Sequence, residues 1–384
     1  MLLVFIAGAI VVLIGTAIIQ NKRSTADVSQ GSPRGSIRIG LMLPLTGDGA
    51  SYGITEQRAA SLAQGEINAK GGIDGKTLEY VTEDSKCDPA GGAAAAQKLV
   101  NVDNVKIIFG GACSGETLAA LPITDEAKVL MLSPSATNPS LSKNDYFFRT
   151  ISSDAGQGAV GARYAFQTLG ARNVAIISEQ TDYAQGLSKV FKDNFKQLGG
   201  QIVTNEVYQT ADTDLRAQVL KIKQTSPDVI YIVPQSPTKG ELIVKQLKAQ
   251  EVSAKFLSTE VFLDRDMLAK NPSLFGGIYA TEPYFDQEAG AAKTFLTKFK
   301  EKYNESPTYP SYAANMYSQA YLIKEGTEKV GTDTAKLKDW LSKIRNWKHA
   351  LGELSFNADG DAVSPYVVRQ IQSDGSLTQI EIMR

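Results

Sequence analysis

The strongest constraint on the fold is the regular alternation of short apolar runs with longer amphipathic stretches along most of the chain. The runs have the length of strands and the stretches have the length of helices, so the pattern predicts βαβ units and parallel sheets. We expect strands at 37–43, 78–83, 105–109, 129–132, 173–178, 201–207, 228–233, 255–258 and 276–280. Helices are expected at 55–70, 92–100, 154–169, 183–198, 212–224 and 238–250.

The pattern changes to three helices after residue 290, at 290–302, 311–328 and 334–345, followed by a short strand pair near 352–356 and 365–383. A chain of 384 residues is longer than one that usually folds around a single hydrophobic core, so two domains are expected. We therefore predict an α/β protein made of two doubly wound parallel-sheet lobes.

The first 20 residues are almost all apolar and carry no charge, which is enough to span a bilayer as a helix. A secretory signal is usually shorter and follows a basic segment. The sequence favours an uncleaved anchor and leaves a cleaved signal open, with 24–26 as the candidate cleavage site. Lys22 and Arg23 follow the apolar run and favour a cytoplasmic position for the chain on its C-terminal side, which conflicts with export. A basic segment upstream of Met1 would remove this conflict. Residues 21–36 are expected to form a flexible tether.

Several function classes are disfavoured by particular residues. The formal net charge of −1 does not favour a nucleic-acid partner. Gly110 and Gly115 have the spacing of a phosphate-binding loop, but Glu116 stands where that loop needs a lysine. Ser114 is not the centre of a G-x-S-x-G motif, and the single histidine, His349, is interpreted as structural.

Metal and redox sites are also disfavoured. Residues 357–361 resemble part of a calcium loop but lack its closing glutamate, so they are expected to form a hairpin turn. The chain has two cysteines, Cys87 and Cys113, whose spacing excludes a CxxC pair. In an exported chain they suggest a disulfide, and two buried free thiols remain the alternative.

Small hydroxyl residues follow two neighbouring strands of the predicted first sheet. Ser114 opens a helix after the strand at 105–109, and Ser135 and Thr137 follow the strand at 129–132. Hydroxyls, backbone N–H groups and a helix N-terminus together suit a small anion such as a carboxylate. Glu260, directly after a strand of the second lobe, is the candidate partner for an ammonium group, with a solvated loop charge as the alternative.

Three tyrosines are candidates to close over the apolar part of a ligand. They are Tyr52, Tyr183 and Tyr317. Each, taken alone, is also compatible with ordinary packing in the core or at its rim.

At this point the chain resembles the substrate-binding proteins of branched-chain amino-acid ABC transporters, which have the type I periplasmic-binding fold. The resemblance runs from Ile37 to near the C-terminus. Its segments are 39–47 with Tyr52-Gly53, the signature Glu66-Ile67-Asn68-Ala69-Lys70-Gly71-Gly72-Ile73-Asp74-Gly75-Lys76, the strand end with Asp84, Cys87, Asp88 and Pro89, the pair Cys113-Ser114, and the segments 133–137 and 183–187.

The resemblance implies a role for each matching residue. Ser114 and Thr137 would hold the carboxylate of an amino acid, and the Ser135 carbonyl, Thr137 and Glu260 would hold its ammonium group. Ala136 belongs to the same segment, and Cys87 and Cys113 would form a disulfide. The side-chain end would be lined by Tyr52, Tyr183, Tyr317 and residue 235, where leucine-binding members carry an aromatic and this chain has Gln235.

The resemblance also implies an architecture and a biological role. The chain would cross between lobes near 150–153, 282–286 and 359–364, so that lobe one is 37–151 plus 286–360 and lobe two is 152–285 plus 361–384. A monomer outside the cytoplasm would close on the amino acid and deliver it to an ABC permease, without cofactor, metal or catalysis. A ligand sensor on the same fold is the alternative, and an enzyme with Ser114 as nucleophile lacks a visible base.

Overall fold

The structure is a computed structural model that describes residues 35–383. The expected N-terminal apolar helix, 1–20, and nearly all of the expected tether lie outside these residues. Among residues 35–383, no helix combines the length and the apolar character needed to cross a membrane. The predicted alternation of strands and helices is confirmed, and it builds two large sheets with helices on both faces of each.

The first sheet has five parallel strands in the order β2-β1-β3-β4-β5. The internal strand β1 is buried over its last five residues, which is expected for a strand covered on both faces. The strands are β1 (Ser36–Leu43), β2 (Thr77–Asp84), β3 (Ile107–Gly110), β4 (Leu130–Ser133) and β5 (Phe147–Arg149).

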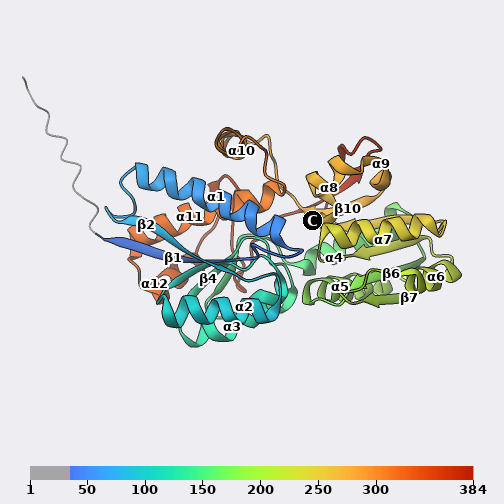
Figure 1. Ribbon diagram of the computed structural model, residues 1–384, viewed down its shortest axis with the longest axis horizontal. Helices are drawn as coiled ribbons and strands as arrows, with labels where there is room; N and C mark the ends of the chain where they lie inside the picture. The colour runs from blue at the N-terminus through green and yellow to red at the C-terminus, as the bar shows by residue number, and fades with distance from the viewer. Residues whose placement is uncertain (1–34, 384) are drawn as a thin grey trace, which may run out of the picture. The chain divides into compact units, whose positions relative to one another are not determined.

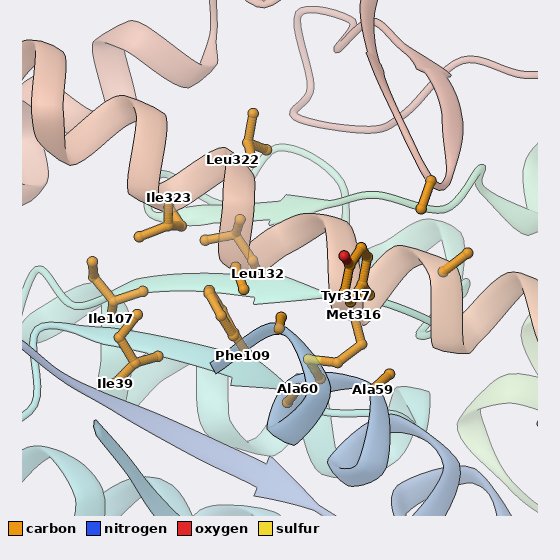
Figure 2. Packing of buried hydrophobic residues seen from close by; sticks show 14 of the residues in the cluster. Ile39, Ala59, Ala60, Ile107, Phe109, Leu132, Met316, Tyr317, Leu322 and Ile323 are labelled. Atoms are coloured by element: carbon orange, nitrogen blue, oxygen red, sulfur yellow. The ribbon is translucent and has the colours of Figure 1, made fainter. Parts of the chain in front are cut away.

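Successive side chains of these strands enter two different cores. Leu41 packs under helices α1 (Ala50–Ala69) and α11 (Pro310–Val330), whereas Met42 packs under α2 (Pro89–Gln97) and α3 (Ser114–Glu126). Figure 1 shows these two helix layers on opposite sides of the sheet. Figure 2 shows the core on the α1 and α11 side, where strand residues such as Phe109 face helix residues such as Met316.

The second sheet has seven strands in the order β14-β13-β10-β9-β8-β6-β7. Five neighbouring strands of this sheet are parallel to one another: β10, β9, β8, β6 and β7. Ile176 of β6 packs toward α4 (Asp154–Arg163) and α5 (Asp182–Gln197), and Ile177 packs toward α6 (Arg216–Thr225) and α7 (Pro237–Ala249). The parallel strands are β6 (Asn173–Glu179), β7 (Gln201–Tyr208), β8 (Val229–Val233), β9 (Lys255–Thr259) and β10 (Tyr279–Pro283).

The expectation of one short strand pair at the C-terminus is wrong. Instead, β12 (Gly352–Leu354) pairs with β11 (Trp347–His349). Strands β13 (Tyr366–Ile371) and β14 (Leu377–Met383) extend the second sheet in antiparallel order. The physical reason is the turn between β13 and β14, closed by a hydrogen bond from Gln372 N to Ser376 O, because it folds 366–383 into a hairpin. The last expected helix is also shorter, at α12 (Thr334–Leu341).

The chain passes between the two sheets three times, after β5, after β10 and after β12. The second passage leads to α10 (Gly290–Tyr303), which packs on the first sheet's core. Arg149, at the end of β5, is fully buried where the first and third passages meet. Its Nε donates to Asp361 Oδ1 at 2.7 Å. Its Nη1 donates to Asn138 O at 2.9 Å and its Nη2 to Ser142 Oγ at 2.8 Å. One guanidinium therefore ties the passages to the loop after β4.

Replacing Arg149 by methionine should lower the free energy of unfolding by about 3–5 kcal/mol, because Asp361 would be left as a buried charge without a partner. Denaturation in guanidinium chloride measures the difference. The control is Lys189→Met, which removes an exposed ion pair with Asp193 and should leave stability nearly unchanged. Equal stability of the two variants would contradict this role of Arg149.

Candidate functional site

A small cavity lies where the carboxyl ends of strands from both sheets meet. It is about 280 Å³ of space between protein atoms, part of which opens to solvent. Its wall is formed by residues from both sheets and their helices, namely Tyr52, Ala112, Cys113, Ser114, Ser135, Tyr183, Gln235, Glu260, Val261 and Tyr312.

Most of the residues expected in the site are brought together here. Those that line the cavity are Tyr52, Ser114, Ser135, Tyr183, Gln235 and Glu260. Ala136 and Thr137 follow Ser135 in the same loop; both are buried, and neither lines the cavity. The expected residue that lies elsewhere is Tyr317.

The loop after β4 owes its shape to Ser133. The Ser133 hydroxyl donates to Gly111 O at 2.7 Å and accepts the backbone N–H of Ala136 at 2.8 Å. These bonds turn the chain sharply after the strand, and they join this loop to the loop after β3. The next residues, Ser135 to Asn138, are thereby held against Ser114, whose Oγ accepts Asn138 N–H at 3.2 Å.

The start of α3 is organised by Glu116, which folds back over its own helix end. Glu116 Oε1 accepts the N–H groups of Ala112 at 2.7 Å and Cys113 at 3.0 Å. Burial raises the pKa of Glu116 to about 7. A carboxyl group thus occupies the backbone donors that a phosphate loop would offer to its ligand. Ser114, the first residue of α3, lines the cavity.

A disulfide joins Cys87 to Cys113 directly beside this helix start, with 5.3 Å between the two Cα atoms. The expected pairing is present, and the alternative of two free thiols is not, since neither cysteine is free. Cys113 lines the cavity, so the bridge fixes part of the wall to the strand end of β2.

Glu260, the first residue after β9, contributes a buried carboxylate to the cavity. Its Oε1 accepts the Tyr183 hydroxyl at 2.9 Å and the Tyr312 hydroxyl at 3.2 Å. Its Oε2 accepts Gln157 Nε2 at 2.5 Å. Burial raises the pKa of Glu260, and these hydrogen bonds oppose that shift. Glu260 takes part in none of the ion pairs found among residues 35–383.

Two further acidic residues are fully buried near the cavity. Asp154 opens α4, and Glu179 ends β6, where its Oε2 accepts Gln235 N–H at 2.8 Å. Neither forms an ion pair within the described part of the chain. Burial, and then the nearby Glu260, raise the pKa of Asp154. Neither acid lines the cavity: Asp154 contacts Thr137, and Glu179 contacts Gln235.

An aromatic cluster closes one side of the cavity. The ring of Tyr52 lies 4.9 Å from that of Tyr309, which stacks on Tyr312 at 5.3 Å between centroids. The Tyr52 hydroxyl donates to Gln235 O at 2.9 Å, so the cluster contacts the second lobe directly. Sequence reasoning did not identify Tyr309, Tyr312 or Gln157. The available signal was the position of the two tyrosines at the start of α11, the helix that follows α10.

Tyr317 lies in the core of the first lobe instead of the cavity. Its hydroxyl donates to Glu66 Oε2 at 2.7 Å, and its ring packs 4.6 Å from Phe295. Figure 2 shows it beside Met316 in that core. Since an α-helix turns about 100° per residue, Tyr312 and Tyr317 point about 140° apart on α11. Only Tyr312 faces the cavity.

Two other residues singled out in the sequence have structural surroundings. His349 Nδ1 lies 3.0 Å from Ser318 Oγ, and burial lowers the pKa of His349 to about 4. The Asn357 side-chain oxygen accepts the N–H groups of Asp359 and Asp361, which forms the expected turn. Asp361 itself binds Arg149.

Two doubly wound sheets that share a small polar cavity at their strand ends define a two-lobed ligand-binding protein. The model of the periplasmic binding protein family matches residues 36–376, and the chain belongs to this family. It is 29% identical over 350 residues to the leucine-, isoleucine-, valine-, threonine- and alanine-binding protein of Pseudomonas aeruginosa, covering 90% of this chain and 92% of that protein.

Solved structures show the same similarity. A leucine binding protein from Thermotoga maritima superposes with a TM-score of 0.84 at 27% identity, covering 91% of this chain and 99% of the other. A branched-chain amino acid transporter substrate binding protein from Streptococcus pneumoniae, in complex with isoleucine, has a TM-score of 0.81 at 30% identity and covers 90% and 99%.

Removing the disulfide with Cys87→Ser and Cys113→Ser together should lower the free energy of unfolding by about 3–4 kcal/mol, because the cross-link closes a loop with a sequence separation of 26. Denaturation with and without reductant measures this loss. Reductant should destabilise the wild-type protein and leave the double variant unaffected. An equal effect of reductant on both proteins would contradict the expected role of the bridge.

Proposed function

We propose that this protein binds a small α-amino acid in the cavity between its lobes, outside the cytoplasm, and delivers it to an ABC permease. The observation that carries the proposal is Glu260, a buried carboxylate that faces the cavity and has no cationic partner among residues 35–383. A buried charge is unfavourable unless it is paired, so the site is completed by a ligand that brings a positive charge.

An ammonium group fits this position better than a metal ion. The oxygen atoms next to the Glu260 carboxylate are the hydroxyls of Tyr183 and Tyr312, and both already donate a hydrogen bond to it. A hydroxyl donor leaves lone pairs for a further N–H group. An ammonium has three such donors, and charge-assisted hydrogen bonds to a carboxylate are strong.

The opposite side of the cavity suits the carboxylate of the same ligand. Ser114 accepts Asn138 N–H and keeps its own hydroxyl hydrogen for donation. It is the first residue of α3, a helix of 13 residues whose dipole favours a negative charge at this end. Together with Glu260 it would read the two charged groups that all α-amino acids share.

The remaining wall would select the side chain. Tyr52 and Val261 offer apolar surface, and Gln235 adds an amide where leucine-binding members carry an aromatic. This lining suits a side chain that is aliphatic or bears a polar group.

The relatives support the transport part of the proposal. The Pseudomonas protein is named for binding five amino acids, and the Streptococcus protein is the substrate-binding component of a transporter. A disulfide is typical of an oxidising compartment outside the cytoplasm. In this proposal the apolar run 1–20 exports or anchors the chain, the folded part acts as a monomer, and no catalytic step takes place.

Calorimetry against the twenty amino acids should find at least one ligand with micromolar affinity or better, an order-of-magnitude expectation. Glu260→Gln should weaken that binding by about 2–5 kcal/mol, because the ligand ammonium would lose its charged partner. The matched control is Glu66→Gln, the same chemical change in the core of the first lobe, where Glu66 contacts Tyr317 and Lys298.

The control should bind like the wild-type protein. If none of the twenty amino acids binds, the proposed amino-acid ligand is wrong, whereas the family assignment still holds. Normal affinity in Glu260→Gln would remove Glu260 from the site.

A pair of tyrosine variants on one helix tests which face of α11 serves the ligand. Tyr312→Phe should weaken amino-acid binding by about 1–2 kcal/mol, because its hydroxyl helps to hold Glu260. Tyr317→Phe should leave the affinity unchanged and reduce stability instead, because it loses a partly buried hydrogen bond to Glu66. Binding titrations and thermal melts separate the two effects, and the reverse pattern would restore Tyr317 to the site.

A further inference from the structure

Most of the hydroxyl groups that line the cavity already use their hydrogens within the protein. The hydroxyls of Tyr183 and Tyr312 both donate to Glu260 Oε1. The Ser135 hydroxyl donates at 2.5 Å to Oε1 of Glu56, a buried residue of α1. These side chains can still accept a hydrogen bond from a ligand, but they have no hydrogen left to donate to one.

The side-chain amide of Gln235 differs, because it has no hydrogen-bond partner among residues 35–383. Both backbone groups of Gln235 are in use: its N–H donates to Glu179 Oε2 at 2.8 Å, and its oxygen accepts the Tyr52 hydroxyl at 2.9 Å. The residue is half-buried and lines the cavity. An amide group has two hydrogens to donate and one oxygen that accepts. Gln235 therefore brings an unused donor and an unused acceptor to the cavity wall.

The groups that all α-amino acids share are accounted for without Gln235. Within the described part of the chain, Ser114 is the other lining side chain that keeps a hydrogen to donate, and the proposed function assigns this hydrogen to the ligand carboxylate. Glu260 is assigned to the ammonium group. The amide of Gln235 is therefore left for the part of the ligand that differs from one amino acid to another.

The charge of the cavity wall disfavours a charged ligand side chain. Glu260 is the one charged residue among the described residues that line the cavity. An acidic ligand side chain would find no cation in this wall, and a basic one would find no carboxylate besides the one that holds the ammonium group. The wall therefore suits an amino acid with an uncharged side chain.

An apolar ligand side chain is disfavoured by the amide itself. A ligand that covers Gln235 removes water from the amide, and an aliphatic group offers neither a donor nor an acceptor in its place. A polar group that loses its water without a new partner weakens binding by about 5- to 150-fold, and the half-buried Gln235 belongs to the lower part of this range. A carboxamide avoids the loss, because two amides can pair through two hydrogen bonds, each donating to the oxygen of the other.

We infer that Gln235 selects an amino acid with a carboxamide side chain, asparagine or glutamine, by pairing with it amide to amide. The inference rests on the proposed function and names the class of ligand that this function leaves open. Gln235 also lines a wider space that opens to solvent, and the wall of that space includes Thr181 and Gln185. The longer side chain of glutamine can extend in that direction.

Calorimetry with pairs of amino acids of nearly equal shape tests the inference on the wild-type protein. Asparagine and leucine have the same branched shape and differ in the polarity of the branch, and glutamine and methionine form a second, longer pair. In at least one pair the carboxamide should bind about tenfold more tightly than its apolar partner. Aspartate, which has the shape of asparagine and a negative charge, should bind more weakly than asparagine.

Gln235→Met removes the amide and keeps the length of the side chain. The ratio of carboxamide to apolar affinity should fall about tenfold, to near one, because specificity is a difference between two affinities. A defect shared by all amino acids cancels in this ratio and would not change it. The matched control is Gln180→Met, the same change at an exposed residue that does not line the cavity, and it should keep the wild-type ratio.

Equal or tighter binding of the apolar member in both pairs would overturn the inference and leave the proposed function in place. An unchanged ratio in Gln235→Met, or binding of other amino acids without either carboxamide, would have the same meaning. If a thermal melt shows that Gln235→Met does not fold, Gln235→Leu measures the same ratio with a smaller apolar side chain. A wild-type protein that binds none of the twenty amino acids would overturn both the inference and the proposed function.

Discussion

The structure depends on one buried cation, the guanidinium of Arg149. It joins the first and third passages between the sheets through Asp361, and it supports the loop after β4 through Asn138. A buried guanidinium needs all its donors satisfied, so the segments that satisfy it are fixed relative to one another. The loop that faces the cavity is thus anchored at the junction of the two lobes. Asp154, five residues further along the chain, accepts the hydroxyl of Thr137 in the same loop.

Much of the fold could be predicted from the sequence, because both faces of each parallel sheet are covered. Strand β8 is apolar throughout and β6 is apolar from 174 to 177, so both stand out from the amphipathic helices between them. The C-terminal part could not be predicted in the same way. Strand β14 lies at a sheet edge and is exposed over most of its length, so it lacks a continuous apolar run. Its partner is set by a turn and not by hydrophobic pattern.

Some residues of the candidate site could also be predicted from the sequence, and others could not. Residues at strand ends, such as Ser114 and Glu260, could be placed because the carboxyl ends of parallel strands meet at one edge. Residues on a late helix could not, because the rotation of α11 relative to the cavity is set by packing against α1, and Tyr312 and Tyr317 are equally plausible in the sequence. The direction of each hydroxyl hydrogen could not be predicted either. It depends on Asp154 and Glu56, which lie far from the loop in sequence.

The contact between Tyr52 and residue 235 has a consequence for how this cavity could change its ligand. The Tyr52 hydroxyl is bonded to the backbone oxygen of Gln235 and not to its amide. Any amino acid at this position supplies the same oxygen, provided that Glu179 still holds its N–H. The closing contact between the lobes is therefore independent of the side chain that lines the cavity. Substitution of residue 235 can alter the preference for one ligand over another without rebuilding the way the two halves meet.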